Sequence, residues 1–328
     1  MKKFLTYSAF FILPLLVLCL LLFAIPYSRE FAYMSKNNQD CNTSWIYHRL
    51  FKNDTKIDIA FIGTSHTGCA INDELIEQNL DSFTHVANLA YCGGGRNLDL
   101  ILLNDIIDSK SPSVLFIEIK NNNAIKHRDY GIMAPAIDLW FPVSITPDYL
   151  INLYTGGKSR LDFLRDQLFF GSKTEIDVQY DSNGKMQKKT EYMYMQPHIK
   201  KKKVIVTIDE KRDHNFMPYF KDTISEDLLL RHMNVKEEIC FDDVAYLEKM
   251  CALAKSKHIK VYLLYLPPYG NYMRDVINQS SYPKIGTVIF PPDDIYSNKN
   301  YWIDGEHLNL AGANVLSKWI SKKIPDLK

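Results

Sequence analysis

Blocks of apolar residues recur through the first third of the chain and predict alternating strands and helices. A near-continuous apolar run predicts a strand over 57–62, and further strands are predicted over 84–89 and 114–119. Between them, Asn72 and Asn97 stand at the start of helical patterns, where their side chains can cap the helices. Strands separated by helices of this length indicate right-handed crossovers and a parallel sheet covered on both faces.

The same alternation returns near the C-terminus. A helix is predicted over 242–257, and apolar strands follow over 261–266 and 287–290, each ended by a Pro-Pro pair. A last helix, which Asn309 can cap, carries an apolar stripe over 310–320. The two stretches together predict one α/β domain.

A long apolar run at the N-terminus predicts a membrane anchor. Residues 4–25 are uncharged and almost wholly apolar, over the length that crosses a bilayer as one helix. Lys2 and Lys3 precede the run, and by the positive-inside tendency they stay in the cytoplasm. We therefore expect a single-pass protein of the cell membrane with the bulk of the chain outside the cytoplasm. A cleaved signal peptide is the alternative, but the sequence after the run fits a cleavage site poorly.

The alternation lapses between 127 and 235, which we interpret as an inserted α+β module. The Asp-Ser-Asn-Gly sequence at 181–184 lies between two polar strands and predicts a hairpin. Such an insertion is expected to cap the crevice of the main domain and to set specificity. The predicted organisation is a transmembrane anchor over 1–25, a connector over 26–55, a main domain over 56–126 and 236–328, and the cap over 127–235.

The composition is that of a folded protein with no excess of either charge. The 328 residues are 46% apolar and carry a formal net charge of +1. A surface that binds nucleic acid usually shows a clear basic excess, so no nucleic-acid partner is expected. The histidines show no ligand spacing, so we expect neither a metal nor another cofactor.

The cysteines permit one disulfide hypothesis. Six cysteines are too few for a disulfide scaffold, and Cys19 lies within the apolar run. Cys69 and Cys92 both follow predicted strands at one edge of the sheet, and outside the cytoplasm a bridge between them is permitted. Free, buried thiols are the alternative.

A serine, a histidine and an aspartate stand where an open parallel sheet gathers its reactive groups. Ser65 follows the first strand on a Gly-Thr-Ser turn into a helix, which exposes its hydroxyl beside backbone donors. Asp304 precedes His307 by three residues in the loop before the last helix. A serine hydroxyl needs a base to take its proton, and that base needs a group that fixes its tautomer. The pattern predicts Ser65 as nucleophile, His307 as base and Asp304 as its orienting acid.

Acyl transfer through a serine also needs donors for the oxygen of the tetrahedral intermediate. The backbone amide of Ser65 is one candidate. The glycines at 93–95, after the second strand, can bring another amide close.

Three sequence blocks together resemble the SGNH (GDSL-type) hydrolase superfamily. The turn at 63–65, the block Asn88 to Gly93 and the Asp304-x-x-His307 block are similar to its first, second and fifth conserved blocks, in the same order. The resemblance implies a flavodoxin-like three-layer α/β/α sandwich that hydrolyses esters or transfers acyl groups through an acyl-serine. Residue by residue, it implies Ser65 as nucleophile and oxyanion donor, Gly93 as a second oxyanion donor, His307 as base and Asp304 as orienting carboxylate.

The block after the third strand departs from the family pattern. The family places Gly-x-Asn-Asp there, with the asparagine amide in the oxyanion hole, whereas this chain has Ile-Glu-Ile-Lys-Asn-Asn-Asn at 117–123. Asn121 is the nearest substitute, and Asn122 competes with it. Glu118 is expected to be a buried, hydrogen-bonded carboxylate that supports the loop. His66 is expected to be an exposed residue at a helix start.

The missing glycine and the glutamate resemble the membrane-anchored branch of that superfamily, which acts outside the cytoplasmic membrane beside a multi-spanning acyltransferase. The leading prediction is an anchored serine esterase or O-acyltransferase that acts on a small acyl ester, such as acetyl, of a cell-surface glycan. Its expected partners are a carbohydrate or other acyl-ester substrate, a membrane acyltransferase, and the membrane through residues 4–25. The alternative is a catalytically degenerate domain that binds a glycan or an acyltransferase.

Overall fold

The structure, a computed structural model, describes residues 2–25, 27–34, 43–93, 95–120, 125–143, 145, 147–170, 178–180, 186–194, 202–207 and 243–327. Contacts divide the chain into two compact units. The first, the outer unit, combines Met1–Lys36 with Arg128–Asp209, and the second, the sheet unit, combines Asn37–His127 with Glu210–Lys328.

The sheet unit is built on a five-stranded parallel sheet with the strand order β2-β1-β3-β7-β8. This order reverses direction between β1 and β3, as in doubly wound α/β sheets, which bind ligands where the strand order reverses. The strands are β1 Ile59–Ile62, β2 Val86–Asn88, β3 Val114–Ile119, β7 Lys260–Tyr265 and β8 Thr287–Ile289.

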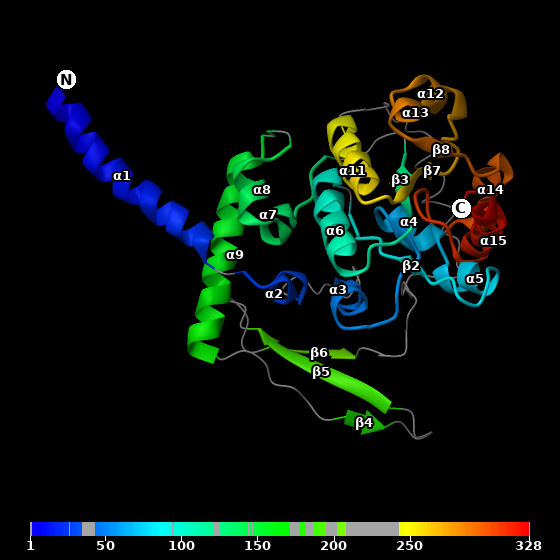
Figure 1. Cartoon of the computed structure of the whole chain (residues 1–328), viewed down its shortest axis with the longest axis horizontal. Coiled ribbons are helices and arrows are strands. Elements are labelled where there is room, and N and C mark those ends of the chain that lie inside the picture. The colour runs from blue at the N-terminus through cyan, green and yellow to red at the C-terminus, as the bar shows by residue number, and fades with distance from the viewer. Residues whose placement is uncertain are drawn as a thin grey trace. The chain divides into compact units, whose positions relative to one another are not determined.

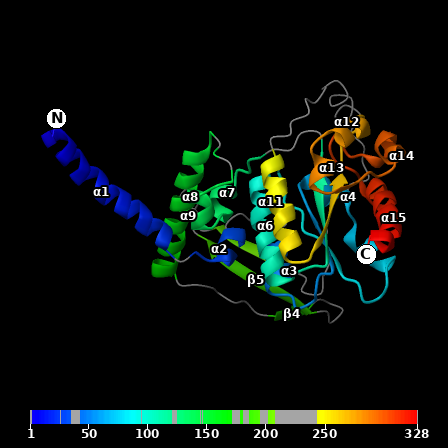
Figure 2. The ribbon, with the colours of Figure 1, turned by 45° about the horizontal axis from the view of Figure 1, so that its top comes forward.

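Helices cover both faces of this sheet and make three layers (Figures 1 and 2). One face is covered by α6 Arg96–Ser109 and α11 Val244–Ser256, with α3 Thr43–Phe51 against α6. The other face carries α4 Ser65–Ala70, α5 Asp73–Gln78 and α15 Leu310–Leu327. The short helices α12 Arg274–Gln279, α13 Tyr282–Ile285 and α14 Asp293–Ser297, and the 3-10 turn Lys299–Tyr301, complete the C-terminal half.

Strand alternation decides which side chains meet the helices. Along β3, Val114 and Phe116 face the α15 side, where the Phe116 ring stacks on Phe61 with 4.6 Å between centroids. Glu118 follows in the same alternation, so its carboxylate points into this core beside α4. A carboxylate in such a place must find donors.

The outer unit contains α1 Lys2–Ala24, α2 Arg29–Met34, α7 Tyr130–Met133, α8 Ala136–Trp140 and α9 Tyr149–Phe170, followed by an antiparallel sheet. That sheet consists of β4 Val178–Tyr180, β5 Met186–Tyr194 and β6 Lys202–Thr207. Tyr180 pairs with Met186, so the hairpin predicted around 181–184 is confirmed by its flanking strands, while its turn lies outside the described residues.

The N-terminal run forms a helix, α1, with Pro14 inside it. Among the helices that the structure describes, none has the length and apolar character required to cross a membrane. The transmembrane anchor over 1–25 stays a prediction.

Helix starts test the predicted caps. Asn72 caps α5, since its side chain accepts a hydrogen bond from the Leu75 amide at 3.1 Å, and Asn309 caps α15 by accepting from the Gly312 amide at 3.0 Å. The cap predicted at Asn97 is wrong. The α6 helix begins two residues earlier, after Gly95, and Asn97 is buried, where it accepts from the His127 amide at 2.9 Å.

Candidate active site

Ser65 is the first residue of α4, directly after the turn that ends β1. Thr64 caps this helix, because its Oγ1 accepts from the His66 amide at 3.2 Å. The turn at Gly63 leaves no room for a side chain, since a Cβ there would lie 2.5 Å from Glu118 Oε2. Ser65 therefore stands at the carboxyl edge of the sheet, at the switch point between β1 and β3.

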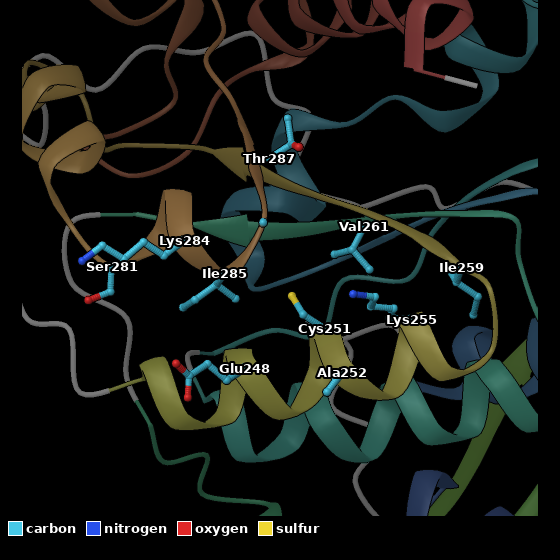
Figure 3. A pocket seen from close by; sticks show the side chains of 11 residues that line it. Glu248, Cys251, Ala252, Lys255, Ile259, Val261, Ser281, Lys284, Ile285 and Thr287 are labelled. Carbon is cyan, nitrogen blue, oxygen red and sulfur yellow. The ribbon is translucent and has the colours of Figure 1, made fainter.

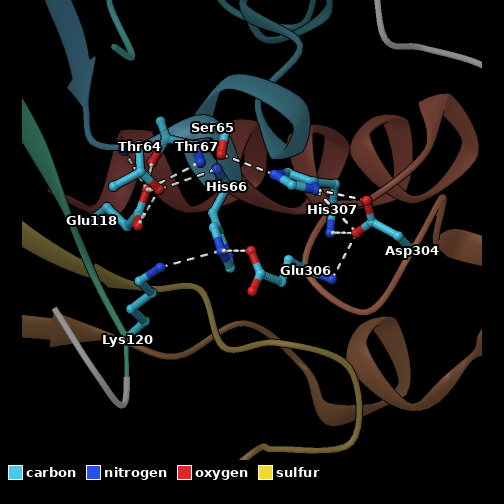
Figure 4. Close-up of polar contacts among 9 residues, drawn as sticks. All are labelled: Thr64, Ser65, His66, Thr67, Glu118, Lys120, Asp304, Glu306 and His307. Atoms are coloured by element: carbon cyan, nitrogen blue, oxygen red, sulfur yellow. Dashed lines mark hydrogen bonds and ion pairs between the residues drawn. The ribbon is translucent and has the colours of Figure 1, made fainter. Parts of the chain in front are cut away.

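The structure brings together the three residues predicted as nucleophile, base and acid (Figure 4). Ser65 Oγ lies 2.9 Å from His307 Nε2, and His307 Nδ1 lies 3.0 Å from both carboxylate oxygens of Asp304. The His307 and Asp304 side chains are 23% and 29% exposed, so a bound molecule can reach them. In this arrangement His307 can take the Ser65 proton while Asp304 holds the Nδ1–H tautomer.

The loop that carries His307 is held by its own aspartate. Asp304 Oδ1 accepts the backbone amides of Glu306 and His307, each at 2.8 Å, in addition to the ring. Burial acts to raise the pKa of Asp304, but the bonds to His307 and to the two amides outweigh it and lower that pKa. The Asp-x-x-His spacing thus builds both the loop and the oriented imidazole.

Glu118 ties the serine turn to β3. Its carboxylate is buried and accepts the amides of Thr64 and Thr67 at 2.8 and 3.1 Å and the hydroxyls of the same two threonines, that of Thr67 at 2.6 Å. Burial acts to raise its pKa, yet His66 when protonated, the Lys120 charge, the Thr67 bond and Arg96 lower it to about 2. The expectation of a buried carboxylate that supports the loop is confirmed.

A buried arginine fixes the end of β3 from the opposite face. Arg96, the first residue of α6, donates to the Glu118 carbonyl, to Asp243 Oδ2 at 2.8 Å and to Asp99 Oδ2 at 3.1 Å. Tyr282 donates to the second oxygen of Asp243 at 2.9 Å. Burial raises the pKa of Asp99 to about 6, although Arg96 opposes the shift. Sequence reasoning missed this cluster because its members come from distant elements.

His66 is buried, so the expectation of an exposed residue at a helix start is wrong. Its side chain is 4% exposed, and Nε2 lies 3.2 Å from Lys120 Nζ and 3.6 Å from Glu306 Oε2. Because an ammonium only donates, Nε2 accepts and the ring is neutral. Burial, followed by the Lys120 charge, lowers the pKa of His66 in agreement with this. His66, Lys120 and Glu306 form a row beside the His307 ring, whose centroid is 5.4 Å from that of the His66 ring (Figure 4).

The predicted oxyanion donors are placed in part. Gly93 lies in the loop after β2, exposed and with a φ of +88°, a conformation that favours glycine. The Ser65 amide lies between the Thr64 and His66 amides, both of which already have acceptors. Asn121 and Asn122 lie outside the described residues.

The proposed disulfide is not formed. Cys69, in α4, and Cys92 are not joined by a disulfide, so the alternative of two thiols applies. Burial, with a smaller effect of Asp304, raises the pKa of the Cys69 thiol to about 12.

A cavity of about 480 Å³ lies away from these residues, between α11 and the segment from α13 to β8 (Figure 3). Its walls mix apolar and charged side chains, including Glu248, Cys251, Lys255 and Lys284. It contains none of the three residues predicted for catalysis. No group of side chains suited to hold a metal ion occurs in the part of the chain that the structure describes.

Comparison with known proteins adds little. No protein-family model matches the chain, and no curated protein matches it. Among solved structures, a protein from Bacteroides fragilis described as a candidate acylhydrolase is similar, with 13% identity over 90% of this chain and 97% of that one, and a TM-score of 0.37. A similarity at this TM-score transfers neither fold nor activity to this chain.

Proposed function

We propose that the chain is a serine esterase or acyltransferase of the SGNH type that works through an acyl-serine at Ser65. The observation that carries the proposal is the continuous hydrogen-bonded series from Ser65 Oγ through His307 to Asp304. The doubly wound strand order and the position of Ser65 at its switch point also support it.

The first half of the reaction forms the acyl-enzyme. Ser65 Oγ attacks the acyl carbon while His307 Nε2 takes the hydroxyl proton, and Asp304 stabilises the resulting imidazolium. The amides of Ser65 and Gly93 are the proposed donors to the tetrahedral oxygen. His307 then gives its proton to the departing alcohol as the carbon–oxygen bond breaks.

The second half repeats these steps with a new acceptor. Water, deprotonated by His307, releases a free acid, whereas a sugar hydroxyl in the same place completes an acyl transfer. The narrower substrate hypothesis, an acetyl or other small acyl ester of a cell-surface glycan, rests on the sequence resemblance alone. The location outside the cytoplasmic membrane likewise stays a sequence prediction.

A fluorophosphonate probe tests the proposal, because it forms a stable bond only with an activated serine. We expect label on the peptide that contains Ser65, and no label after Ser65→Ala or His307→Ala. The matched control is His85→Ala. His85 lies just before β2, at the amino end of the parallel strands, whereas Ser65 lies at their carboxyl end, so the substitution should leave labelling unchanged.

The outcome also separates this proposal from the binding-module alternative. If the folded wild-type protein neither takes label nor hydrolyses 4-nitrophenyl acetate, the proposed enzymatic function is contradicted. Binding of an acetylated oligosaccharide by that unreactive protein would favour the alternative.

A further inference from the structure

His127 lies against the peptide that is proposed to bind the oxyanion. Its side chain is 5% exposed, and Nε2 lies 2.8 Å from the Cys92 carbonyl oxygen. A carbonyl oxygen only accepts, so Nε2 carries the proton and donates. The Tyr91 ring meets the imidazole edge to face at 5.1 Å, which fixes the plane of the imidazole ring.

The backbone of His127 is anchored at the same place. Its amide donates to Asn97 Oδ1 at 2.9 Å, and the Asn97 amide donates to the Ile125 carbonyl at 3.0 Å. The fit is close, since a Cβ at Gly95 would lie 2.4 Å from the Cβ of His127. The start of α6 therefore holds His127 in one position.

The Cys92–Gly93 peptide, to which His127 donates, follows a segment that runs beside the serine turn. After β2, the amides of Leu89 and Tyr91 donate to the carbonyls of Phe61 and Gly63 at 2.8 and 2.9 Å. This pairing continues the β1–β2 register to within two residues of Gly93 and carries the chain alongside the turn into Ser65.

We propose that His127 is a positioning residue that aims the Gly93 amide at the tetrahedral oxygen, an inference that rests on the function proposed above. The Cys92 carbonyl and the Gly93 N–H belong to one planar trans peptide, in which they point in opposite directions. A donor that holds the carbonyl from one side therefore directs the N–H to the other. The same hydrogen bond polarises the peptide and strengthens the N–H as a donor.

Removing the hydrogen bond from His127 to the Cys92 carbonyl should slow the chemical step more than it weakens substrate binding. Loss of a whole oxyanion donor costs about 100- to 1,000-fold in kcat, so a loosened donor should cost about 10- to 100-fold. His127→Leu supplies a side chain of similar size that has no hydrogen-bond donor, and His127→Gln can still present an amide N–H to the carbonyl. We expect the Leu variant to lose kcat with an unchanged KM, and the Gln variant to recover most of the loss.

An NMR measurement can follow the Cys92–Gly93 peptide directly. Cys92-Gly93 is the only Cys-Gly pair in the 328-residue sequence, so carbonyl-labelled cysteine with ¹⁵N-glycine gives a single correlated NMR signal in the full chain. His127→Leu should shift this signal, and His127→Gln should return it toward the wild-type position. In the wild type, a boronic acid that forms a tetrahedral adduct on Ser65 should move the Gly93 proton, and its affinity should fall in His127→Leu by the same factor as kcat.

His85→Ala serves as the control histidine and should change neither the signal nor kcat. A folded His127→Leu protein with wild-type kcat and boronate affinity, in an enzyme that does react, overturns the positioning role alone. An equal loss in the Leu and Gln variants, with KM rising together, also overturns it in favour of a general packing defect. A wild type that never reacts with the boronate or an ester overturns the proposed function, and the positioning role with it.

Discussion

Asp304 is the residue that orients the proposed base, His307, through hydrogen bonds to its ring. In Asp304→Asn the side-chain oxygen can still accept the two loop amides, but its NH₂ cannot accept the His307 Nδ1 proton. The ring then favours the tautomer that cannot take the Ser65 proton. We expect a loss of about 10³- to 10⁴-fold in kcat for an acetyl ester, with an unchanged thermal midpoint. An Asn variant within tenfold of the wild type would contradict this role.

Glu118 makes the stability of the protein depend on acid pH. Its pKa is about 2 in the folded protein against an ordinary 4.5, so its carboxylate contributes stability above about pH 4.5 that is lost as the pH falls toward 2. Glu118→Gln should lower the free energy of unfolding by about 1–3 kcal/mol near neutral pH, because its amide leaves part of the threonine cluster without an acceptor. Urea unfolding at several pH values measures both effects.

The control for that experiment is Glu74→Gln, an exposed residue of α5. It should change the stability by no more than about 0.5 kcal/mol. If Glu118→Gln unfolds with the same acid dependence as the wild type, the carboxylate is not the source of that dependence.

Cys69 and Cys92 should differ in reactivity although neither is bridged. Cys69 is buried with a pKa of about 12, whereas Cys92 is half-buried. Only the thiolate reacts. With iodoacetamide at pH 8 we expect modification of Cys92 and not of Cys69 in the native protein, and of both after denaturation without reductant. If both cysteines of the denatured protein react only after reduction, the hypothesis of a disulfide between Cys69 and Cys92 would be correct after all.

At the scale of elements, the β1–α4 turn depends on a close approach of backbone to side chain. In Gly63→Ala the new Cβ would lie 2.4 Å from Thr67 Oγ1 as well as against Glu118, so the turn must open. We expect a loss of about 1–3 kcal/mol in the free energy of unfolding and slower fluorophosphonate labelling of Ser65. Gly286→Ala is the matched control, because its added Cβ would lie 3.4 Å from Leu263 Cγ, an ordinary van der Waals contact. Equal effects of the two substitutions would contradict the steric argument.

Elements that carry their own signal could be predicted from sequence. The strand predicted over 114–119 has those bounds in the structure, since its apolar run stops at Lys120. A helix after the Ser65 turn was predicted, but its extent was not, because the six residues of α4, Ser-His-Thr-Gly-Cys-Ala, show no apolar period. The start of α6 was misplaced because the positive φ of Gly95, which no pattern reveals, begins the helix.

Some residues of the candidate site could also be predicted from sequence, and others could not. Ser65, His307 and Asp304 could be found because their spacing follows from local chemistry, a turn after a strand and a carboxylate that caps its own loop. The environment of His66 could not be predicted, since Lys120 reaches it from just after β3 and Glu306 from the loop before α15. Contacts between residues so far apart in sequence leave no local trace.

At the scale of the whole molecule, all described residues of the candidate site lie in the sheet unit. We expect that a chain starting at Asn37, with 128–209 replaced by a Gly/Ser linker, still folds and takes fluorophosphonate on Ser65. The cost of closing such a loop grows only slowly with its length. A folded but unreactive product would show that the outer unit contributes to the site.

The proposed base, His307, and its acid, Asp304, occupy one short loop. The proposed nucleophile, Ser65, begins a helix 242 residues before His307 in the chain and is hydrogen-bonded to it. What keeps the two together is the docking of α15 on α5, where the Asn72 amide donates to Ser317 Oγ at 2.9 Å and the Asn72 side chain to Asn314 at 2.8 Å. Warming that loosens this C-terminal helix would therefore stop turnover while the sheet is still intact. Reactivity of Ser65 should therefore report whether α15 stays docked on α5.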